Sequence, residues 1–310
     1  MHEWHPTLSQ LQDDDLLSLL RIRQFELALL ELFSQGKLHG TTHTSLGQEY
    51  IPVALNPLFE ENDFLFSNHR GHGHYLARYA DLTGLLAEIM GREGAICQGL
   101  GGSQHLYREQ QYLSTGVQGE ALPVACGVAL HLKRAKQGAM AVVYIGDGTW
   151  GEGTTYEALN IARLWQLPLL VIVENNQIAQ STPRHQQMAG TIEGRTRAFD
   201  VNFLRVVSDD INLIRSAIAP HIQSLRTTCL PLVIEFETYR LGPHSKGDDT
   251  RDEATLQQLQ QNDWQIRYQQ QFPDQSLRCT EIARQQVEAV IADVEQRPLL
   301  QVASVVEGRP

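Results

Sequence analysis

The sequence predicts an α/β fold with a mostly parallel sheet and helices on both of its faces. Three segments are largely apolar, as strands are when both faces of a sheet are covered: Ala139–Ile145, Leu167–Val173 and Pro231–Thr238. Segments with helical spacing of apolar residues lie between them, and this alternation is typical of parallel strands joined by crossover helices. The composition fits an ordinary globular chain, because 42% of the residues are hydrophobic and 20% are charged.

The N-terminal part of the chain is expected to be helical. Asp14–Gln35 has apolar residues at helical spacing after an acidic start, and Gly36 is a typical helix stop. Residues 40–47 are expected to form a turn. The turn leads to a second helix over Gln48–Leu55, which ends near Pro57.

The region from Ser67 to Gly119 is dense in Gly and His and contains one expected helix, Leu82–Met90. Such loops around a short helix are typical of a functional site rather than of a packed layer. Further helices are expected at Pro123–Lys136, Gly151–Trp165, Asn212–Leu225, Thr255–Gln261 and Thr280–Gln296. Because the sequence shows no repeat and no flexible linker, we expect residues 1–310 to form a single domain with an N-terminal helix and a C-terminal helical extension.

Charge and cysteine content exclude several classes of protein. The formal net charge is −11, and the 25 Lys and Arg residues form no basic run, which argues against a nucleic-acid partner. No apolar stretch approaches the roughly 18–20 residues that cross a bilayer, so we expect no membrane partner. The four cysteines lie far apart without a CxxC pair, which disfavours a disulfide framework or a zinc site. With no signal or transit pattern at the N-terminus, we expect a cytoplasmic protein.

Polar residues follow two of the expected strands. Gly146-Asp147-Gly148 comes directly after Ala139–Ile145, and Glu174-Asn175-Asn176 follows the next strand. Asn176 lies 29 positions after Asp147, which fits strand, crossover helix and strand. Both side chains are therefore expected at the carboxyl ends of parallel strands, where open α/β sheets hold ligands. The glycines allow close approach of the backbone, and a helix starting near Gly151 directs its first amides to the same place.

This arrangement predicts a diphosphate and metal site. Backbone amides and a helix N-terminus favour an anion, whereas the Asp147 carboxylate repels one unless a cation lies between them. An Asp and an Asn supply hard oxygen donors, which suit Mg²⁺ bridging to a diphosphate. Each motif alone would be an ordinary turn. The two together, at this interval, favour the site.

These motifs resemble the thiamine diphosphate signature, and Glu157–Pro168 resembles the alpha subunit of the 2-oxo acid dehydrogenases of pyruvate, branched-chain and acetoin types. The similarity covers roughly residues 20–255. It is carried by further motifs in the same order: Gly36-Lys37-Leu38-His39-Gly40, Gly47-Gln48-Glu49, His69-Arg70-Gly71-His72-Gly73, Gly102-Ser103-Gln104-His105 and Tyr239-Arg240-Leu241-Gly242-Pro243-His244-Ser245. The resemblance implies a thiamine diphosphate-binding fold, with thiamine diphosphate and Mg²⁺ as cofactors.

The resemblance also implies which residues hold these cofactors. Asp147, Asn176 and the backbone carbonyl of Ile178 match the metal ligands. The remaining cofactor-binding positions match residues that contact the diphosphate or the aminopyrimidine ring. Gly146, Gly148 and Thr149 match the diphosphate loop, His69 and Arg70 match a Tyr-Arg pair on the phosphates, and Gly116 and Gln118 match backbone contacts to the ring.

Four histidines are candidate catalytic residues, because an imidazole that titrates near neutrality can orient or move a proton. By resemblance, His43 faces the substrate carboxylate or carbonyl oxygen. His244 lies in the loop that covers the cofactor and orients or protonates the acyl adduct. His72 matches a motif histidine for which a structural role is almost as well supported, and His105 is the fourth candidate.

The resemblance implies that this chain needs a partner. The glutamate that activates the cofactor belongs to the beta subunit, which carries the pyrimidine-binding domain, so we expect an α2β2 heterotetramer with the cofactor at the subunit interface. A lipoyl-domain acyltransferase is a further expected partner. The expected reaction is decarboxylation of a 2-oxo acid, or cleavage of acetoin, followed by transfer of the acyl unit to an acceptor such as a lipoyl carrier.

Two other functions stay open at this point. One is a thiamine-dependent carboligase or acyltransferase, similar to a split transketolase, that makes a C–C bond in biosynthesis. The other is a non-catalytic alpha-like scaffold, which the intact Asp147, Asn176, Arg70 and His244 disfavour. The sequence does not distinguish among pyruvate, acetoin and branched 2-oxo acids as substrates.

Overall fold

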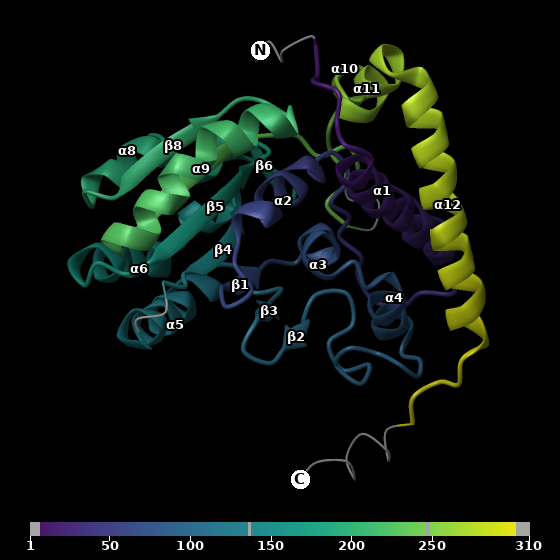
Figure 1. Cartoon of the computed structure of the whole chain (residues 1–310), viewed down its shortest axis with the longest axis horizontal. Coiled ribbons are helices and arrows are strands. Elements are labelled where there is room, and N and C mark those ends of the chain that lie inside the picture. Colours follow the sequence, from purple (N-terminus) through teal and green to yellow (C-terminus); the bar gives the residue numbers. More distant parts are fainter. Residues whose placement is uncertain (1–6, 136–137, 246–248, 302–310) are drawn as a thin grey trace.

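The computed structural model describes residues 7–135, 138–245 and 249–301. At its centre is a seven-stranded sheet in the order β2-β3-β1-β4-β5-β9-β8 (Figure 1). All neighbouring pairs are parallel except β2 with β3, which confirms the mostly parallel sheet. The strands are β1 (Phe64–Ser67), β2 (Tyr107–Arg108), β3 (Tyr112–Ser114), β4 (Ala141–Gly146), β5 (Leu169–Asn175), β8 (Asn202–Val206) and β9 (Leu232–Glu237).

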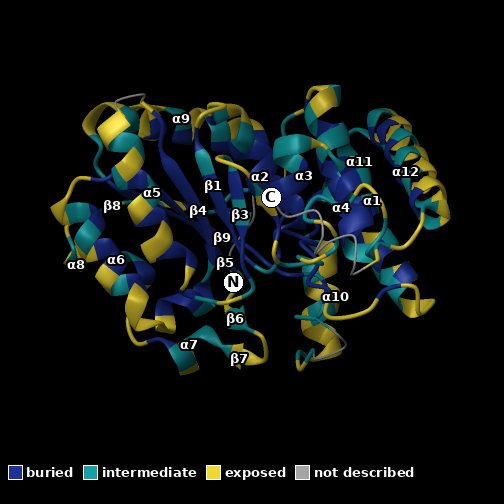
Figure 2. Cartoon of the chain, turned by 90° about the horizontal axis from the view of Figure 1, so that it is seen from below, coloured by how far each residue is buried: buried dark blue, intermediate teal, exposed yellow. Residues whose placement is uncertain are grey.

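Helices cover both faces of the sheet, as expected for strands that are apolar on both sides. Successive residues of β4 point to opposite faces, and Val143 joins a core with α5 (Ala121–Ala135), α6 (Gly153–Leu164) and α8 (Ile192–Ala198). Its neighbour Tyr144 joins the core on the other face, with α2 (Tyr50–Leu55) and α9 (Ile211–Thr228). Viewed from below, the central strands are buried almost throughout (Figure 2).

Segments from the two ends of the chain form a helical layer beside the sheet. The N-terminal helix α1 (Asp13–Ser34) packs along the C-terminal helix α12 (Pro273–Gln296), as Figure 1 shows. α3 (His72–Tyr79), α4 (Leu82–Met90), α10 (Glu253–Gln261) and α11 (Trp264–Gln271) complete the helices of this region. The interpretation of residues 1–310 as one domain stays a prediction.

A buried ionic network ties α1 to the C-terminal helices. The Arg23 guanidinium donates two hydrogen bonds to the Asp263 carboxylate, at 2.7 and 3.0 Å, and one to Glu49 at 2.5 Å. Trp264 lies under the guanidinium and donates its indole N–H to the second Glu49 oxygen at 3.1 Å. Every donor and acceptor in this network therefore finds a partner, as buried charges require.

Several elements differ from the expectation. α3, β2 and β3 lie in the region expected to form loops around a single helix, and β1, β8, α8 and α11 were not expected at all. The last helix begins at Pro273 rather than at Thr280, and Lys136, the expected end of another helix, lies outside the described residues. Smaller elements complete the chain: 3₁₀ turns at Asn56–Leu58 and Asp147–Gly151, β6 (Ile178–Ala179), β7 (Thr182–Pro183) and α7 (Arg184–Gln187).

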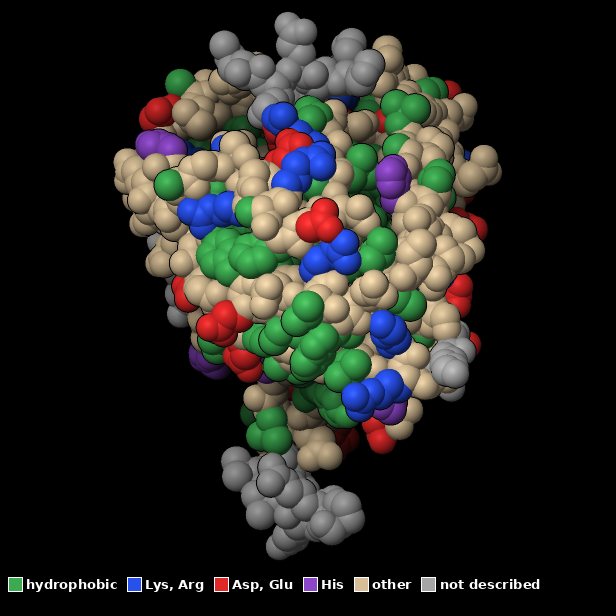
Figure 3. Space-filling model, turned by 90° about the vertical axis from the view of Figure 1, so that its left-hand side faces the viewer, with side chains coloured by type: hydrophobic (Ala, Val, Ile, Leu, Met, Phe, Trp, Pro, Cys, Tyr) green, Lys and Arg blue, Asp and Glu red, His purple; other side chains and the backbone are tan. Residues whose placement is uncertain are grey.

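On the face shown in Figure 3, Lys and Arg side chains are interspersed with Asp and Glu, and hydrophobic side chains lie between them. Leu164 and Trp165, at the end of α6, are two of the exposed apolar side chains of the molecule. Within the described residues, no helix combines the length and the apolar character that crossing a bilayer requires.

Candidate active site

A cleft of about 320 Å³ opens at the carboxyl ends of β1, β4 and β5. Its walls come from the turn before α2, the loop before β2, the segment after β3, the segments after β1, β4 and β5, and the loop after β9. Most of the predicted site residues line it: His43, His69, Arg70, Gly116, Gln118, Gly146, Asp147, Gly148, Asn176, Ile178 and His244. The structure therefore brings together residues that span 201 positions of the sequence.

Asp147 begins the 3₁₀ turn after β4 and is 2% exposed. Among the described residues, its Oδ2 atom is buried without a hydrogen-bond partner. Burial raises the pKa of this carboxyl to about 6, although a backbone hydrogen bond and the cations of Arg184, Arg240 and Arg70 act in the opposite direction. A buried, uncompensated carboxylate at a cleft wall is a ligand suited to a cation.

Asn176 follows β5 and is oriented by its neighbours. Its Nδ2 donates to Gln48 Oε1 at 3.0 Å, so the amide oxygen of Asn176 points away from Gln48. That oxygen accepts the Ile178 backbone N–H at 3.3 Å and retains a second lone pair. Since β4 and β5 pair in parallel, with Gly146 opposite Glu174, the two predicted metal-binding side chains end at the same edge of the sheet.

The glycine turn after β4 lies against the hairpin of β6 and β7. A Cβ atom on Gly148 would lie 3.0 Å from the Ala179 side chain, so the turn fits closely. The Gln187 side chain donates to the Gly148 carbonyl oxygen from the other side. Thr149 does not line the cleft; it is fully buried, and its hydroxyl donates to Gln118 Oε1 at 2.9 Å.

Arg70 joins three parts of the site. Its Nη1 donates to the Thr44 carbonyl oxygen at 2.9 Å, and its Nη2 donates to His244 Nδ1 at 3.0 Å and to the His244 carbonyl oxygen at 3.2 Å. The turn over 40–47 packs closely against the loop after β9, because a Cβ on Gly47 would lie 2.8 Å from the backbone carbonyl oxygen of Tyr239. The φ of Gly47 is +95°, which also favours glycine at this position. These contacts bring His43 and His244 to the same wall.

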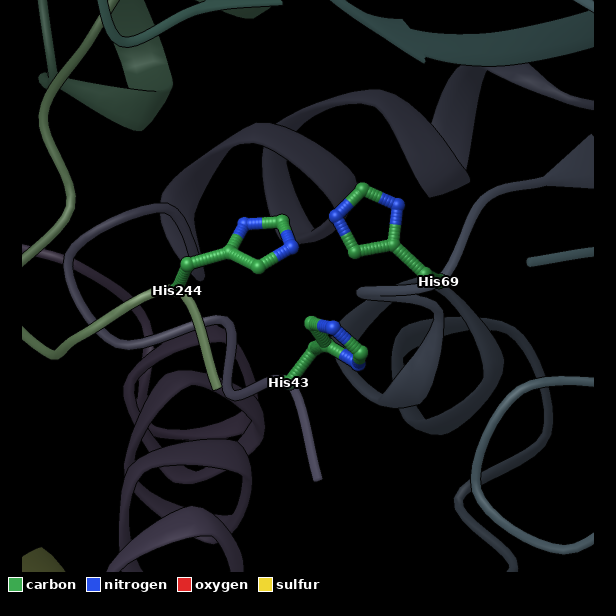
Figure 4. A group of neighbouring side chains, drawn as sticks. All are labelled: His43, His69 and His244. Atoms are coloured by element: carbon green, nitrogen blue, oxygen red, sulfur yellow. The ribbon is translucent and has the colours of Figure 1, made fainter. Parts of the chain in front are cut away.

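Three of the predicted histidines form one cluster (Figure 4). The ring centroids of His43 lie 4.7 Å from those of both His69 and His244, and the latter two are 5.2 Å apart. One ring nitrogen from each lies within 4.8 Å of the others. Burial, and after it the Arg70 guanidinium, the neighbouring imidazoles of His43 and His244 and the Arg240 guanidinium, hold the pKa of His69 well below its usual range.

His72 and His105 are placed differently from this cluster. His72 is fully buried behind the cleft, where Nδ1 lies 3.1 Å from Glu26 and Nε2 lies 2.9 Å from the Ser103 hydroxyl. These bonds match the structural role considered for it. His105 is exposed, with its ring beside Gly116.

The structure adds residues that the motifs did not single out. Gln48, Asn68, Gln104 and Glu174 lie in quoted motifs or beside them, and their position next to predicted ligands could have indicated a role. Gln187 and Gln180 lie beyond any motif, and only the folding of the β6–β7 hairpin brings them to the cleft.

The profile of the family described as Dehydrogenase E1 component matches residues 18–298. The chain belongs to this family. It is 34% identical over 252 residues to the alpha subunit of acetoin:2,6-dichlorophenolindophenol oxidoreductase from Bacillus subtilis, covering 79% of this chain and 75% of that protein. It is 31% identical over 246 residues to the pyruvate dehydrogenase E1 component subunit alpha of Rhizobium meliloti, covering 77% and 71%.

The human mitochondrial pyruvate dehydrogenase E1 alpha subunit, somatic form, is 31% identical over 265 residues, covering 84% of this chain and 68% of the human protein. These comparisons confirm the resemblance to alpha subunits of 2-oxo acid dehydrogenases. The E1 family implies thiamine diphosphate as the cofactor.

Proposed function

We propose that this E1 chain is the alpha subunit of an enzyme that decarboxylates a 2-oxo acid, or cleaves acetoin, and passes the acyl unit to an acceptor such as a lipoyl carrier. The observation that carries this proposal is the buried Asp147 carboxylate at the cleft, whose Oδ2 has no hydrogen-bond partner among the described residues. Such a group stabilises a bound cation and destabilises the cation-free fold.

The donor set fits Mg²⁺ with a diphosphate. Asp147, the amide oxygen of Asn176 and the carbonyl oxygen of Ile178 would hold the cation, since all are hard oxygen donors. Gly146 and Gly148 would approach the diphosphate through the backbone, and Gly116 and Gln118 would contact the aminopyrimidine ring in the same way. Thr149, which lies behind this turn, would support it from the interior. Arg70, with His69 beside it, supplies positive charge and N–H donors to phosphate oxygens.

When bound, thiamine diphosphate supplies a nucleophilic carbon and an electron sink. The chain's own residues bind, orient and protonate. His43 and His244 lie edge to face on the same wall of the cleft, with ring centroids 4.7 Å apart, where their imidazoles can hold or move a proton at a substrate oxygen. Arg70 fixes the loop that carries His244, and His72 supports the opposite wall through Glu26 and Ser103. His105, at the rim, stays a candidate.

We infer that the beta subunit completes the site with its pyrimidine-binding domain and activating glutamate, and that an α2β2 assembly forms. A lipoyl-domain acyltransferase is the proposed acceptor partner. Acetoin as the substrate has support of its own, because the acetoin:2,6-dichlorophenolindophenol oxidoreductase alpha subunit is about as similar to this chain as the pyruvate dehydrogenase alpha subunits are. Carboligation and a purely structural role have no such support here.

The test uses the chain co-expressed with its beta subunit, assayed with pyruvate, branched 2-oxo acids and acetoin and an artificial electron acceptor. We expect turnover of at least one substrate that requires thiamine diphosphate. His244→Ala should keep cofactor affinity and lower turnover at least tenfold. If no member of the panel is oxidised while the complex binds cofactor, the proposed reaction is wrong.

A further inference from the structure

The Gln118 side chain links the diphosphate turn to the histidine cluster. Thr149 donates its hydroxyl hydrogen to Gln118 Oε1 at 2.9 Å, so in the structure the amide oxygen of Gln118 is turned towards Thr149. The Gln118 NH₂ group therefore faces His69 and donates to its Nδ1 at 2.7 Å. Because Thr149 is fully buried, this arrangement is set from the interior of the protein.

The hydrogen bond determines where His69 carries its proton. A neutral imidazole has one N–H and one acceptor nitrogen, and a ring whose Nδ1 accepts must carry the hydrogen on Nε2. Burial and the surrounding cations keep the pKa of His69 well below its usual range, so the ring is neutral at physiological pH. His69 is then a hydrogen-bond donor without a positive charge of its own.

His244 has the same tautomer for a different reason. A guanidinium can only donate, so His244 Nδ1, 3.0 Å from Arg70 Nη2, must be the acceptor nitrogen. In Figure 4 the Nε2 atoms of His69 and His244, the ring nitrogens away from the side-chain stems, face each other above His43. Two N–H groups that face each other do not bond to one another, and together they suit an acceptor placed between them.

The tautomers, rather than the spacing, favour an oxygen atom over a metal ion. One ring nitrogen from each histidine lies within 4.8 Å of the others, a limit that fits either ligand. Two donors that share one oxygen at about 2.9 Å from each can be about 5 Å apart. Nitrogens on one zinc ion would lie about 3.3 Å apart, given metal–nitrogen bonds of about 2.0 Å. A metal ion bound at Nε2 would also require the proton of each ring to move to Nδ1, which breaks the bonds from Gln118 and Arg70.

We propose that Gln118 is a positioning residue that holds His69 with its proton on Nε2, so that His69 and His244 offer two N–H donors to one ligand oxygen in the cleft. This rests on the proposed function for the identity of the ligand. The acceptor is either a substrate oxygen on which charge develops or a diphosphate oxygen, and both are stabilised by preorganised donors.

The test compares four variants in the co-expressed complex. In Gln118→Glu the carboxylate accepts from Nδ1, moves the His69 proton there and leaves Nε2 as an acceptor. Gln118→Met keeps the volume and removes the bond. We expect Gln118→Glu to lower kcat/KM at least 100-fold and Gln118→Met less than tenfold. His69→Gln, which retains a donor near the place of Nε2, should stay at least tenfold more active than His69→Leu.

Cofactor affinity identifies the oxygen. If thiamine diphosphate binds the Gln118→Glu complex with unchanged affinity while kcat/KM falls, the acceptor belongs to the substrate; if affinity falls in parallel, it belongs to the diphosphate. Equal activity of Gln118→Glu and Gln118→Met, or of His69→Gln and His69→Leu, would overturn the proposal.

A spectroscopic measurement separates this proposal from the function itself. In the complex labelled with ¹⁵N-histidine, the His69 signals, assigned by their loss in His69→Leu, should show the Nε2–H tautomer and change to Nδ1–H in Gln118→Glu. This result does not require turnover, so a complex that turns over no substrate would contradict the proposed function alone. Unchanged His69 signals in Gln118→Glu would contradict the tautomer assignment.

Discussion

Asp147 is the residue at which stability and function oppose each other. Within the part of the chain that the structure describes, its Oδ2 atom is buried without a hydrogen-bond partner, and burial raises the pKa of the carboxyl from an ordinary 3.8 to about 6. Because the folded-state pKa lies above that of the unfolded chain, ionisation destabilises the cation-free fold. The destabilisation is absent below pH 3.8, grows as the pH rises to about 6 and is then constant at about 3 kcal/mol.

Asp147→Asn should therefore stabilise the cation-free chain, and more so at high pH. Thermal unfolding with a chelator should show a higher Tm for Asp147→Asn than for the native chain at pH 7.5, with the difference shrinking towards pH 4.5. Asp200→Asn is the matched control, since the Asp200 side chain is 83% exposed. A lower Tm for Asp147→Asn across this range would show that the carboxylate has a partner in the cation-free protein.

Residues of the site differed in how well the sequence predicted them. Asp147 and Asn176 follow strands whose apolar runs are unambiguous, so their place at the sheet edge could be derived. The bond from Gln118 to His69 could not, because it depends on a side-chain contact across 49 positions. Glu26 holds His72 behind the cleft. Because Glu26 lies 46 positions before His72, no local pattern around His72 predicts this contact.

At the scale of elements, one carboxylate of α4 organises a loop of the site. Glu88 is 1% exposed and accepts four backbone N–H groups, from Cys97, Gly99, Gly101 and Gly102, at 2.7 to 3.1 Å. This loop continues to Gln104, which lines the cleft. Glycines have no side chains that could stabilise one conformation of this loop. The hydrogen bonds to the buried Glu88 carboxylate therefore stabilise it.

Glu88→Gln should destabilise the chain by about 2–4 kcal/mol, because the new NH₂ group would face two backbone donors. Chemical denaturation measures this change, and we also expect a higher KM for thiamine diphosphate in the complex. Glu93→Gln, at an exposed position of the same loop, should change stability by less than about 0.5 kcal/mol. Equal stability of the two variants would show that the Glu88 carboxylate does not hold the loop.

The Arg23 network makes a similar prediction for the helical layer. Arg23→Met would leave the buried carboxylates of Glu49 and Asp263 without their cation and should cost about 3–5 kcal/mol in the free energy of unfolding. Arg284→Met, on exposed α12 pairs, should cost less than about 1 kcal/mol. An effect of Arg23→Met as small as that of the control would mean that solvent reaches the network.

The elements that could be predicted are those whose own sequences indicate how they are buried. β4, β5 and β9 are buried along almost their whole length, and their sequences are largely apolar. β1 and β3 have four and three residues and lie among glycines and histidines, so pairing with β4 rather than local pattern makes them strands. α3 starts with His72-Gly73-His74, a sequence that disfavours a helix unless tertiary contacts hold it.

At the scale of the whole molecule, the cleft opens at one edge of the sheet, as expected of a site that a second subunit completes. The purified chain alone should turn over 2-oxo acids at less than 1% of the rate of the complex with its beta subunit. Assaying both at equal chain concentration and saturating thiamine diphosphate and Mg²⁺ checks this. Appreciable turnover by the isolated chain would mean that the chain carries its own activating acid.

We propose that a divalent cation held by Asp147 also binds the diphosphate of the cofactor. Calorimetric titration of thiamine diphosphate into the co-expressed complex tests it most directly, with and without Mg²⁺, for the native chain and for Asp147→Asn. We expect a binding heat for the native complex only when Mg²⁺ is present, and at least 100-fold weaker binding for Asp147→Asn. Equal affinity without Mg²⁺, or in Asp147→Asn, would contradict it.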